Sequence, residues 1–497
     1  MRKCMALLMI LALLMSGVAG AEGTYSLAGY DVASVGHDWP NNLFFQRMQE
    51  MTGIAFTYRQ YTDAAKWQAA KDAFISGAEP MPDVLFKAAL TPQETQALLD
   101  AGLIIDLRPL IESDMPNLWA MLQQNPQWLE DITLPDGRIG ALPGINQLQN
   151  NNAIWINTNW LAALKMDMPT TPEEFTAVLR AFRDLDPNLN GKKDEIPMTF
   201  TGMWDLNFLA HAYGVVMNDY HVCVDADGKV ITPVTTAEYR IFVEWMRLLW
   251  EERLIDHNGF SSADTTRAIT DAEADITYGV VFGPSPMNML PSAALNQYSM
   301  LPPFVYEGKQ VYRDFAGDVI RGTFAVSASA KDPAALLRWA DYLYTEEGCR
   351  LAQAGLEGVE YELHEDGTWA WIGSVETVAN TVLAKSTIYE GGAMPGLSSV
   401  AFQLAYDDAQ TQRVVQAQSE LKQLCVLPYP LVYLSVTDNA WLNATQMELG
   451  FYIDKTVAGF IAGDYPLDDQ TWGDFCKGVE SRGMADVLAL LQAAIDN

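Results

Sequence analysis

Short apolar runs alternate along the chain with longer amphipathic stretches, and three of those stretches carry signals for the start of a helix. Residues 171–182 begin with Thr-Pro-Glu-Glu, and apolar residues then recur at helical spacing. Residues 235–250 begin with a threonine that is followed three positions later by a glutamate, and residues 332–343 begin with Asp-Pro. These patterns predict three helices that each bury one apolar face.

The strand signals are shorter than the helix signals. Residues 83–86, 154–156 and 277–282 are mostly apolar runs next to polar residues, proline or glycine, a pattern that predicts buried strands. Three Asp-Gly pairs predict hairpin turns between extended segments, at residues 136–137, 227–228 and 366–367. This alternation of helices and strands indicates an α/β protein.

The first 21 residues have the parts of a secretory signal peptide. Arg2 and Lys3 give a positive start, residues 5–15 are apolar, and the small residues 19–21 permit cleavage before Glu22. The apolar run is too short to span a bilayer, which takes roughly 20 such residues. We therefore predict an exported protein, either periplasmic or extracellular.

Length, charge and cysteine content narrow the picture. The 476 residues after Ala21 exceed the roughly 50–250 residues of a usual domain, so at least two lobes are expected, with the polar run 146–152 as a candidate connector. The formal net charge of −32 makes a nucleic-acid partner unfavourable. The cysteines of the mature chain lack metal-binding spacing, and both thiols and disulfides stay open for Cys223, Cys349, Cys425 and Cys476.

Residues 186–195 form the most specific motif in the chain. Oxygen-bearing side chains stand at positions 1, 3, 5 and 9 of this segment, with a glycine at position 6. The spacing is typical of a calcium loop, because Ca²⁺ takes six to eight oxygen ligands and the glycine permits the sharp turn. The predicted ligands are Asp186, Asn188, Asn190, the Lys192 carbonyl, Asp194 and Glu195.

The loop differs from an EF-hand, because Pro197 stands where an EF-hand has its last, bidentate glutamate. We expect Glu195 to take that role and a structural Ca²⁺ to fix the turn between a helix and a strand. The alternative is an ordinary polar turn in which Asp186 and Asp194 are merely solvated.

Several segments, in this order along the chain, are similar to family 1 extracellular solute-binding proteins of ABC importers, in particular to the branch that includes alginate and other oligosaccharide receptors. The segments that carry the resemblance are 82–84, 136–143, 155–161, 169–197, 283–284, 345–348 and 355–361. They span most of the mature chain. In the alginate receptors a loop similar to residues 186–195 binds calcium structurally.

The resemblance implies a two-lobed periplasmic-binding-protein fold of type 2, with mixed sheets flanked by helices and a hinge between the lobes. It assigns residues 22–150 and about 305–345 to lobe one, and residues 151–304 and about 400–497 to lobe two. A solute, with an oligosaccharide favoured, would bind in the cleft and close the lobes. The membrane subunits of the importer would then recognise the closed form of a monomeric receptor.

Aromatic residues in loops and at strand ends are the candidates for solute contact, because sugar sites combine apolar faces with a few polar groups. Trp39 and Trp204 each follow a predicted strand, and the turn after residue 282 matches a cleft-facing segment of related maltose-type receptors. The full candidate set is Trp39, Trp204, Phe282, Gly283, Tyr361 and Trp441. By contrast, Trp245, Trp250 and Trp339 lie on amphipathic helices and are expected to pack.

Other functions stay open beside this one. A secreted glycosidase would need two positioned carboxylates, which a chain with 63 acids cannot identify by pattern, and no hydrolase motif is present, so we predict no enzymatic activity. A calcium-dependent surface adhesin would account for export and calcium but not for the ordered family segments. Lipid anchoring is not expected, because Cys4 precedes the apolar run of the signal peptide and no cysteine directly follows that run.

Overall fold

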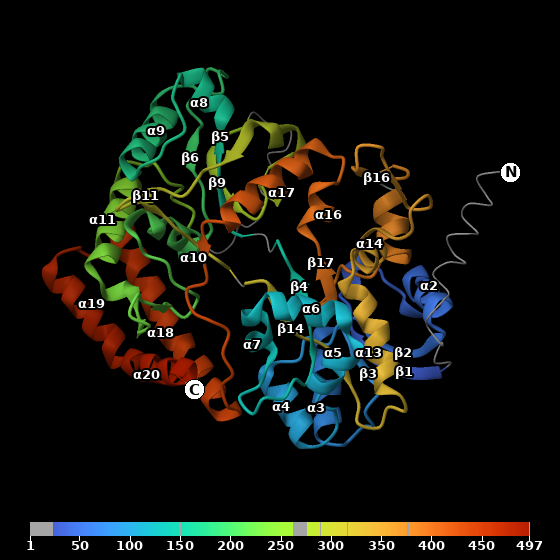
Figure 1. Ribbon diagram of the computed structural model, residues 1–497. Coiled ribbons are helices and arrows are strands. Elements are labelled where there is room, and N and C mark those ends of the chain that lie inside the picture. The colour runs from blue at the N-terminus through green and yellow to red at the C-terminus, as the bar shows by residue number, and fades with distance from the viewer. Residues whose placement is uncertain are drawn as a thin grey trace. The chain divides into compact units, whose positions relative to one another are not determined.

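The computed structural model describes residues 23–148, 151–261, 276–288, 290–315, 317–374 and 377–496 (Figure 1). The chain divides into two compact units, and each unit is assembled from two separate segments. Unit 1 comprises Met1–Gln147 and Asp318–Asp407, and unit 2 comprises Leu148–Gly317 and Asp408–Asn497. The predicted signal peptide lies outside the described residues. Within them, no helix has both the length and the apolar character that a membrane span needs.

The observed division differs from the expected lobe boundaries. Residues 305–317 lie in unit 2 rather than in lobe one, and residues 400–407 lie in unit 1 rather than in lobe two. Residues 346–399, to which no lobe was assigned, also lie in unit 1. Strand β13 (Tyr312–Arg313) pairs in parallel with β18 (Cys425–Val426), a strand of unit 2. This pairing holds the segment on unit 2, so the second crossing between the units falls at residues 317–318 instead of near residue 304.

Unit 1 is built on a six-stranded mixed sheet in the order β17-β4-β14-β3-β1-β2. All of its strands are parallel except β14, which inserts between β3 and β4. The strands are β1 (Gly23–Tyr30), β2 (Ile54–Tyr61), β3 (Val84–Phe86), β4 (Leu142–Asn146), β14 (Val319–Val326) and β17 (Gly396–Ser398). The two chain segments of unit 1 therefore interlock within one sheet.

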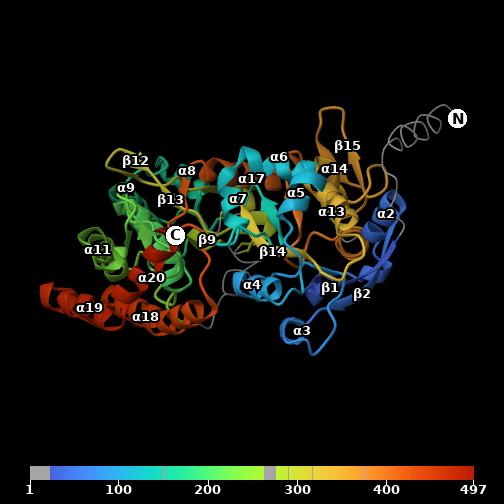
Figure 2. The same cartoon turned by 60° about the horizontal axis from the view of Figure 1, so that its bottom comes forward.

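Helices and one hairpin complete unit 1. The helices are α2 (Leu43–Thr52), α3 (Ala64–Ile75), α4 (Pro92–Asp100), α5 (Arg108–Asp114), α6 (Pro116–Gln124), α7 (Pro126–Ile132), α13 (Pro333–Asp341), α14 (Glu346–Ala354) and α16 (Val400–Leu404). Short 3-10 and π turns are η1 (Ala33–Val35), η2 (Trp39–Asn41), η7 (Tyr342–Tyr344) and η8 (Val378–Leu383). The hairpin of β15 (Tyr361–Leu363) and β16 (Trp369–Trp371) projects from the rest of unit 1 (Figure 2).

Unit 2 is built on a four-stranded mixed sheet in the order β10-β5-β9-β6. Strands β6 and β9 are parallel, and β5 runs against both β9 and β10. The strands are β5 (Ala153–Asn157), β6 (Ile196–Met198), β9 (Tyr278–Gly283) and β10 (Tyr298–Met300). Two small hairpins join β7 (Cys223–Val224) to β8 (Val230–Ile231) and β11 (Val305–Tyr306) to β12 (Lys309–Gln310). The mixed sheets of both units confirm the α/β fold class.

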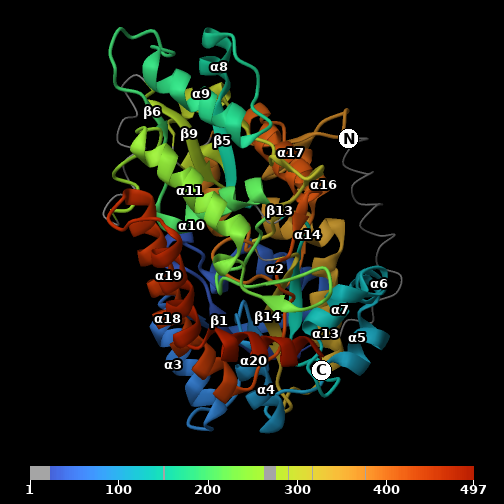
Figure 3. The same ribbon diagram turned by 90° about the vertical axis from the view of Figure 1, so that its left-hand side faces the viewer.

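Helices make up most of the rest of unit 2. They are α8 (Thr158–Leu164), α9 (Pro172–Asp184), α10 (Gly202–Asn207), α11 (Ala237–Glu251), α17 (Ala409–Lys422), α18 (Val436–Ala462), α19 (Asp469–Ser481) and α20 (Met484–Asp496). The 3-10 turns are η3 (Phe208–Tyr213), η4 (Pro233–Thr235), η5 (Pro286–Asn288) and η6 (Ser292–Gln297). The last three helices lie together, with α18 also against α11 (Figure 3).

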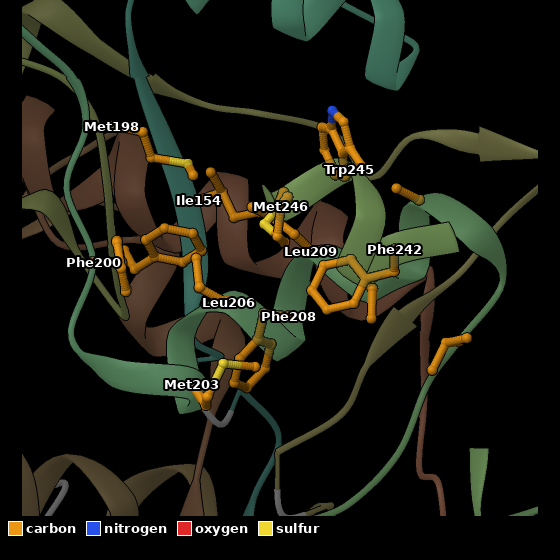
Figure 4. Packing of buried hydrophobic residues seen from close by; sticks show 14 of the residues in the cluster. Ile154, Met198, Phe200, Met203, Leu206, Phe208, Leu209, Phe242, Trp245 and Met246 are labelled. Atoms are coloured by element: carbon orange, nitrogen blue, oxygen red, sulfur yellow. The ribbon is translucent and has the colours of Figure 1, made fainter. Parts of the chain in front are cut away.

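The core of unit 2 forms where α11 packs on the sheet and on η3. Figure 4 shows Phe242 and Met246 of α11 beside Leu209 of η3, with Ile154 of β5 close by. Each of these four side chains is at most 2% exposed. Burying a large apolar side chain of this kind stabilises a fold by roughly 1.5–3 kcal/mol. Helix α11 therefore anchors the elements that carry the candidate site.

The predicted helix starts and turns are correct with two exceptions. Thr171 and Asp332 cap α9 and α13 by accepting hydrogen bonds from backbone N–H groups. Helix α11 is capped by Thr236 rather than by Thr235, because the preceding turn η4 includes Thr235. The Asp-Gly pair at 136–137 forms a turn between α7 and β4 rather than a hairpin, whereas the other two pairs lie in the β7–β8 and β15–β16 hairpins.

Candidate functional site

Three strands of the unit 2 sheet end at one edge, its carboxyl edge. Strands β6, β9 and β10 run in the same direction, so their carboxyl ends meet at one edge. In open α/β sheets, ligands bind outside the carboxyl ends of the strands. Helix α10 begins shortly after β6 and therefore brings its side chains to this edge.

Two aromatic rings form a corner beside this edge. Trp204 of α10 and Phe315, which follows β13, are each 42% exposed. Their ring centroids lie 5.9 Å apart and their planes meet at 88°. Phe208 supports the Trp204 ring from below at 5.1 Å. We call Trp204 and Phe315 the aromatic corner, since two perpendicular apolar faces reach solvent there.

An aspartate and an arginine border the aromatic corner. Asp219 Oδ1 accepts hydrogen bonds from Trp204 Nε1 at 3.1 Å and from the Arg313 guanidinium at 2.7 Å. The Asp219 side chain is 58% exposed, whereas that of Arg313 is only 8% exposed and packs over the Phe208 ring. The buried arginine therefore holds an accessible carboxylate next to the indole.

A buried carboxyl group lies beneath these residues. Asp205 is 6% exposed and accepts hydrogen bonds from Asn152 Nδ2 at 2.9 Å and from the Thr201 N–H at 2.7 Å. Burial raises the pKa of Asp205 to about 6. The Tyr312 hydroxyl donates to the Asn152 carbonyl, so β5, α10 and β13 are joined at this point. These hydrogen bonds fix the base of the aromatic corner.

The predicted solute contacts do not come together as one set. Trp204 is 42% exposed, and Trp441, which lies on α18, is 39% exposed, so both side chains reach solvent. Phe282 is 3% exposed and belongs to the core of unit 2, where the Gly283 carbonyl accepts a hydrogen bond from Trp155. Tyr361 is buried in unit 1 against Trp369, with ring centroids 5.7 Å apart. Phe282 and Tyr361 therefore present almost no surface in this conformation.

Trp39 lies in the core of unit 1 rather than on its surface. It is 0% exposed, and its indole N–H donates to Asp31 Oδ2 at 2.9 Å. Its ring packs edge-on to Phe86 at 5.5 Å. The polar indole N–H is satisfied inside the protein, which removes the usual cost of burying a tryptophan. We do not retain Trp39 among the candidate contacts.

Asp31 belongs to a buried charge network at the carboxyl ends of β1 and β3. Its carboxylate binds Lys87 Nζ at 2.9 Å and His37 Nδ1 at 2.8 Å, and the Asp31 and Lys87 side chains are both 0% exposed. Lys87 also donates to the carbonyls of Ile388 and Glu390. Burial opposes ionisation of Asp31, but the His37 hydrogen bond and the Lys87 charge bring its pKa below the usual value. This network fastens residues 388–390 over the edge of the unit 1 sheet.

The predicted calcium loop is folded around its own oxygen atoms. The Asp186 carboxylate accepts from the N–H groups of Asn190 and Gly191, at 3.1 and 2.8 Å. Asn190 Oδ1 accepts from the Lys192 N–H at 2.7 Å. Gly191 has a φ of +76°, the left-handed conformation that the tight turn needs. The predicted positions 1, 5 and 6 thus lie in a tight turn whose side-chain oxygens accept hydrogen bonds from the loop's own N–H groups.

Glu195 is the residue of this loop that fits a cation best. Its Oε1 atom is buried and has no hydrogen-bond partner among the described residues. Burial and the charges of Asp194 and Asp186 raise the pKa of Glu195. In the described part of the chain, no three His, Cys, Asp or Glu side chains meet in a metal-binding arrangement. Amide and backbone oxygens would therefore have to complete any coordination shell around the three acids of the loop.

Sequence reasoning missed Asp219, Arg313 and Phe315. The last two lie in the segment that was expected in lobe one, so nothing connected them with Trp204. Asp219 lies in a turn between η3 and β7, one acid among 63, and carries no motif. The four cysteines of the mature chain, for which the sequence left both states open, are free thiols.

The sequence of the chain is similar to those of known binding proteins and of a lipoprotein. The chain is 27% identical over 489 residues to the fructooligosaccharide ABC transporter substrate-binding protein FusA of Streptococcus pneumoniae, a match that covers 92% of this chain and 87% of FusA. It is 28% identical over 230 residues to lipoprotein LipO of Bacillus subtilis, covering 43% and 44% of the two chains. It is 24% identical over 403 residues to the polygalacturonan/rhamnogalacturonan-binding protein YtcQ of B. subtilis, covering 74% and 76%. No family model matches the chain.

Solved structures share the fold across nearly the whole chain. FusA of S. pneumoniae in complex with kestose has a TM-score of 0.71 at 24% identity, covering 95% of this chain and 99% of FusA, and an EF-hand mutant of FusA is similar. An extracellular solute-binding protein of Bifidobacterium longum subsp. infantis has a TM-score of 0.79 at 20% identity, covering 97% and 99%. Alginate-binding protein AlgQ2 without calcium has a TM-score of 0.67 at 17% identity, covering 97% and 100%. In sequence and in fold, the chain thus resembles the substrate-binding proteins of ABC transporters, as its ordered motifs predict.

Proposed function

We propose that this protein is the oligosaccharide-binding receptor of an ABC importer and has no enzymatic activity of its own. The observation that carries the proposal is the similarity to FusA over 92% of the chain, which includes both segments of each unit. The aromatic corner supports it independently, because exposed aromatic faces beside a carboxylate suit the apolar faces and hydroxyl groups of a sugar. Trp204 is the predicted contact that this arrangement favours, and Trp441 is a second candidate.

Solute capture closes the two units around the ligand by a hinge motion at the chain crossings near residues 147–148, 317–318 and 407–408. The membrane subunits of the importer then bind the closed form of the monomeric receptor. This order of events requires the solute to favour the closed state in free energy. The protein acts outside the cytoplasm; its similarity to lipoprotein LipO makes fatty-acid labelling of cells a direct test of whether it carries a lipid anchor.

The binding test uses purified protein that begins at Glu22. Kestose is expected to raise the melting temperature and to bind with a measurable heat by calorimetry, since a ligand that binds only the folded state stabilises it by mass action. Chromatography of the sugar after long incubation is expected to show intact kestose. If kestose, maltotriose and trigalacturonate all leave the melting temperature unchanged, the receptor proposal is wrong. Release of shorter sugars would identify a glycosidase instead.

The receptor also holds a structural calcium ion in the loop 186–195. Its ligands are the oxygens of Asp186, Asn188, Asn190, Asp194 and Glu195 together with the Lys192 carbonyl. Two features support this assignment: the buried Glu195 Oε1 has no hydrogen-bond partner in the part of the chain that the structure describes, and Asp186 and Asn190 accept hydrogen bonds from N–H groups of the loop. Calcium would neutralise the loop's acids and tie α9 to β6.

Calcium binding is measured by calorimetry on protein stripped with EDTA. The wild type is expected to bind one Ca²⁺ and to melt at a higher temperature with it, whereas Glu195→Gln lowers calcium affinity at least about tenfold. Asp227→Asn, in the exposed turn of the β7–β8 hairpin, is the matched control and keeps the affinity of the wild type. Wild-type protein that takes up no Ca²⁺ would leave this loop an ordinary polar turn.

A further inference from the structure

The aromatic corner carries a chemical preference among sugars. We infer that Asp219 makes this site selective for neutral oligosaccharides and excludes sugars that bear carboxylates. The inference rests on the proposed receptor function and adds to it a residue that decides the substrate class. Similarity alone does not decide that class, because the relatives include proteins named for fructooligosaccharide and for polygalacturonan.

The charges around the aromatic corner are the first argument. The segments that carry its residues, 202–219 and 312–315, and the segment 422–427, whose strand β18 pairs with β13, contribute two cations, Arg313 and Lys422. Arg313 is paired with Asp219 at 2.7 Å, and Lys422 is paired with Asp314 at 2.7 Å. A uronate carboxylate that entered the corner would therefore meet cations whose charge is already balanced.

The exposure of Asp219 is the second argument. A carboxylate offers about four acceptor positions, and Trp204 and Arg313 use two at the same oxygen, Oδ1. Because the side chain is 58% exposed, hydroxyl groups of a bound solute can donate to the remaining positions. Charge-assisted hydrogen bonds of this kind are stronger than neutral ones. The same negative charge repels a second carboxylate brought to that position.

The geometry of the rings is the third argument. Trp204 and Phe315 meet at 88°, so one ring can stack on the flat face of a sugar while the other contacts its edge. Trp204 Nε1 donates to Asp219, which fixes the orientation of the indole relative to the carboxylate. One sugar residue can thus touch both rings and the acid at once. Asp219 is therefore a specificity-determining residue, and the aromatic corner is its apolar counterpart.

The test measures the ratio of two affinities. Wild-type protein is titrated by calorimetry with kestose, a neutral trisaccharide, and with trigalacturonate, its anionic counterpart in size. Kestose is expected to bind at least about 100-fold more tightly. Asp219→Asn is expected to weaken kestose binding about fivefold, since a neutral acceptor replaces a charged one, and to reduce the kestose-to-trigalacturonate ratio at least about tenfold. The ratio of the wild type should also fall as salt is added, because salt screens the Asp219 charge.

Controls separate this inference from the receptor proposal. Asp474→Asn removes another exposed acid of unit 2, on α19, and should leave both affinities unchanged. Phe451→Ala removes a ring that is 68% exposed on α18 and should also have no effect, whereas Phe315→Ala should weaken kestose binding at least about tenfold. The selectivity inference is overturned if kestose binds and Asp219→Asn keeps the wild-type ratio, or if trigalacturonate binds the wild type as well as kestose does. Wild-type protein that binds no sugar at all would overturn both proposals. Among these outcomes, only that one contradicts the proposed receptor function.

Discussion

The carboxyl edges of the two sheets occupy equivalent positions in their units, but the residues at this edge are buried in unit 1 and exposed in unit 2. In unit 1, Asp31, Lys87 and Trp39 are fully buried, and residues 388–390 cover them. In unit 2, Trp204 and Asp219 reach the surface, whereas Arg313, which binds Asp219, is buried. The same topological location is thus covered and internally braced in one unit and exposed in the other, where we propose that it binds solute.

The two tryptophans that follow strands differ in the surroundings of the aspartate that each one binds. Both indole N–H groups donate to an aspartate, Trp39 to Asp31 and Trp204 to Asp219. Asp31 is also bound by the buried Lys87, which donates hydrogen bonds to the carbonyls of Ile388 and Glu390 in a distant segment of the chain. Asp219 is bound by Arg313. The buried and the exposed ring thus differ in the cation that binds their aspartate and in what that cation also binds.

The largest expected effect is at Lys87. Lys87→Met leaves the Asp31 carboxylate buried without its cation and should lower the free energy of unfolding by about 3–5 kcal/mol. Urea denaturation of the wild type and the variant measures the difference. The double variant Asp31→Asn/Lys87→Met removes both charges and should recover part of the loss. Lys477→Met, which breaks a solvent-exposed pair with Asp474, should change stability by less than about 1 kcal/mol.

The next largest effects distinguish the roles of the two tryptophans. Trp39→Ala opens a cavity in the core of unit 1 and should cost about 3–5 kcal/mol of stability. Trp204→Ala removes a half-exposed ring and should cost less than about 1 kcal/mol, yet weaken kestose binding at least about tenfold. Denaturation and calorimetry on both variants test the comparison directly. Equal losses of stability in the two variants would contradict the difference between a buried edge in unit 1 and an exposed edge in unit 2.

A smaller effect concerns the buried Asp205. Its pKa is raised from 3.8 to about 6, so between these pH values the folded protein holds a proton there that the unfolded chain releases. Its contribution to stability therefore falls as the pH rises from about 4 to 7, by at most about 3 kcal/mol. Asp205→Asn abolishes this term, so the stability of the variant relative to the wild type should increase over that range. Melting temperatures of the wild type and the variant, measured from pH 4 to 8, test this.

The smallest expected effect is at Trp441. This side chain is 39% exposed on α18, and Trp441→Ala should change stability by less than about 1 kcal/mol. Its effect on kestose affinity decides whether α18 contributes to the site. A loss comparable to that of Trp204→Ala would place both residues in contact with the sugar, whereas wild-type affinity would confine recognition to the aromatic corner.

Local chemistry in the sequence predicted much of the fold. The caps of α9 and α13 and two of the Asp-Gly hairpins follow from short-range hydrogen bonding, which a sequence displays directly. The position of β13 could not be predicted in this way, because its two residues are held by pairing with β18, more than a hundred positions later. That long-range contact decides where Phe315 and Arg313 lie. The candidate calcium loop was visible in the sequence because its predicted ligands are close together in the chain, whereas the aromatic corner joins residues from two separate segments.

The position of β14 has a consequence for the order of folding. This strand fills the gap between β3 and β4, and its partners end 173 residues or more before it begins. Until the ribosome has made residue 326, the sheet of unit 1 lacks a strand between two others, and contacts of such long sequence separation form slowly. Unit 2 waits longer still for α17 to α20. A chain arranged in this way remains incompletely folded through most of its synthesis.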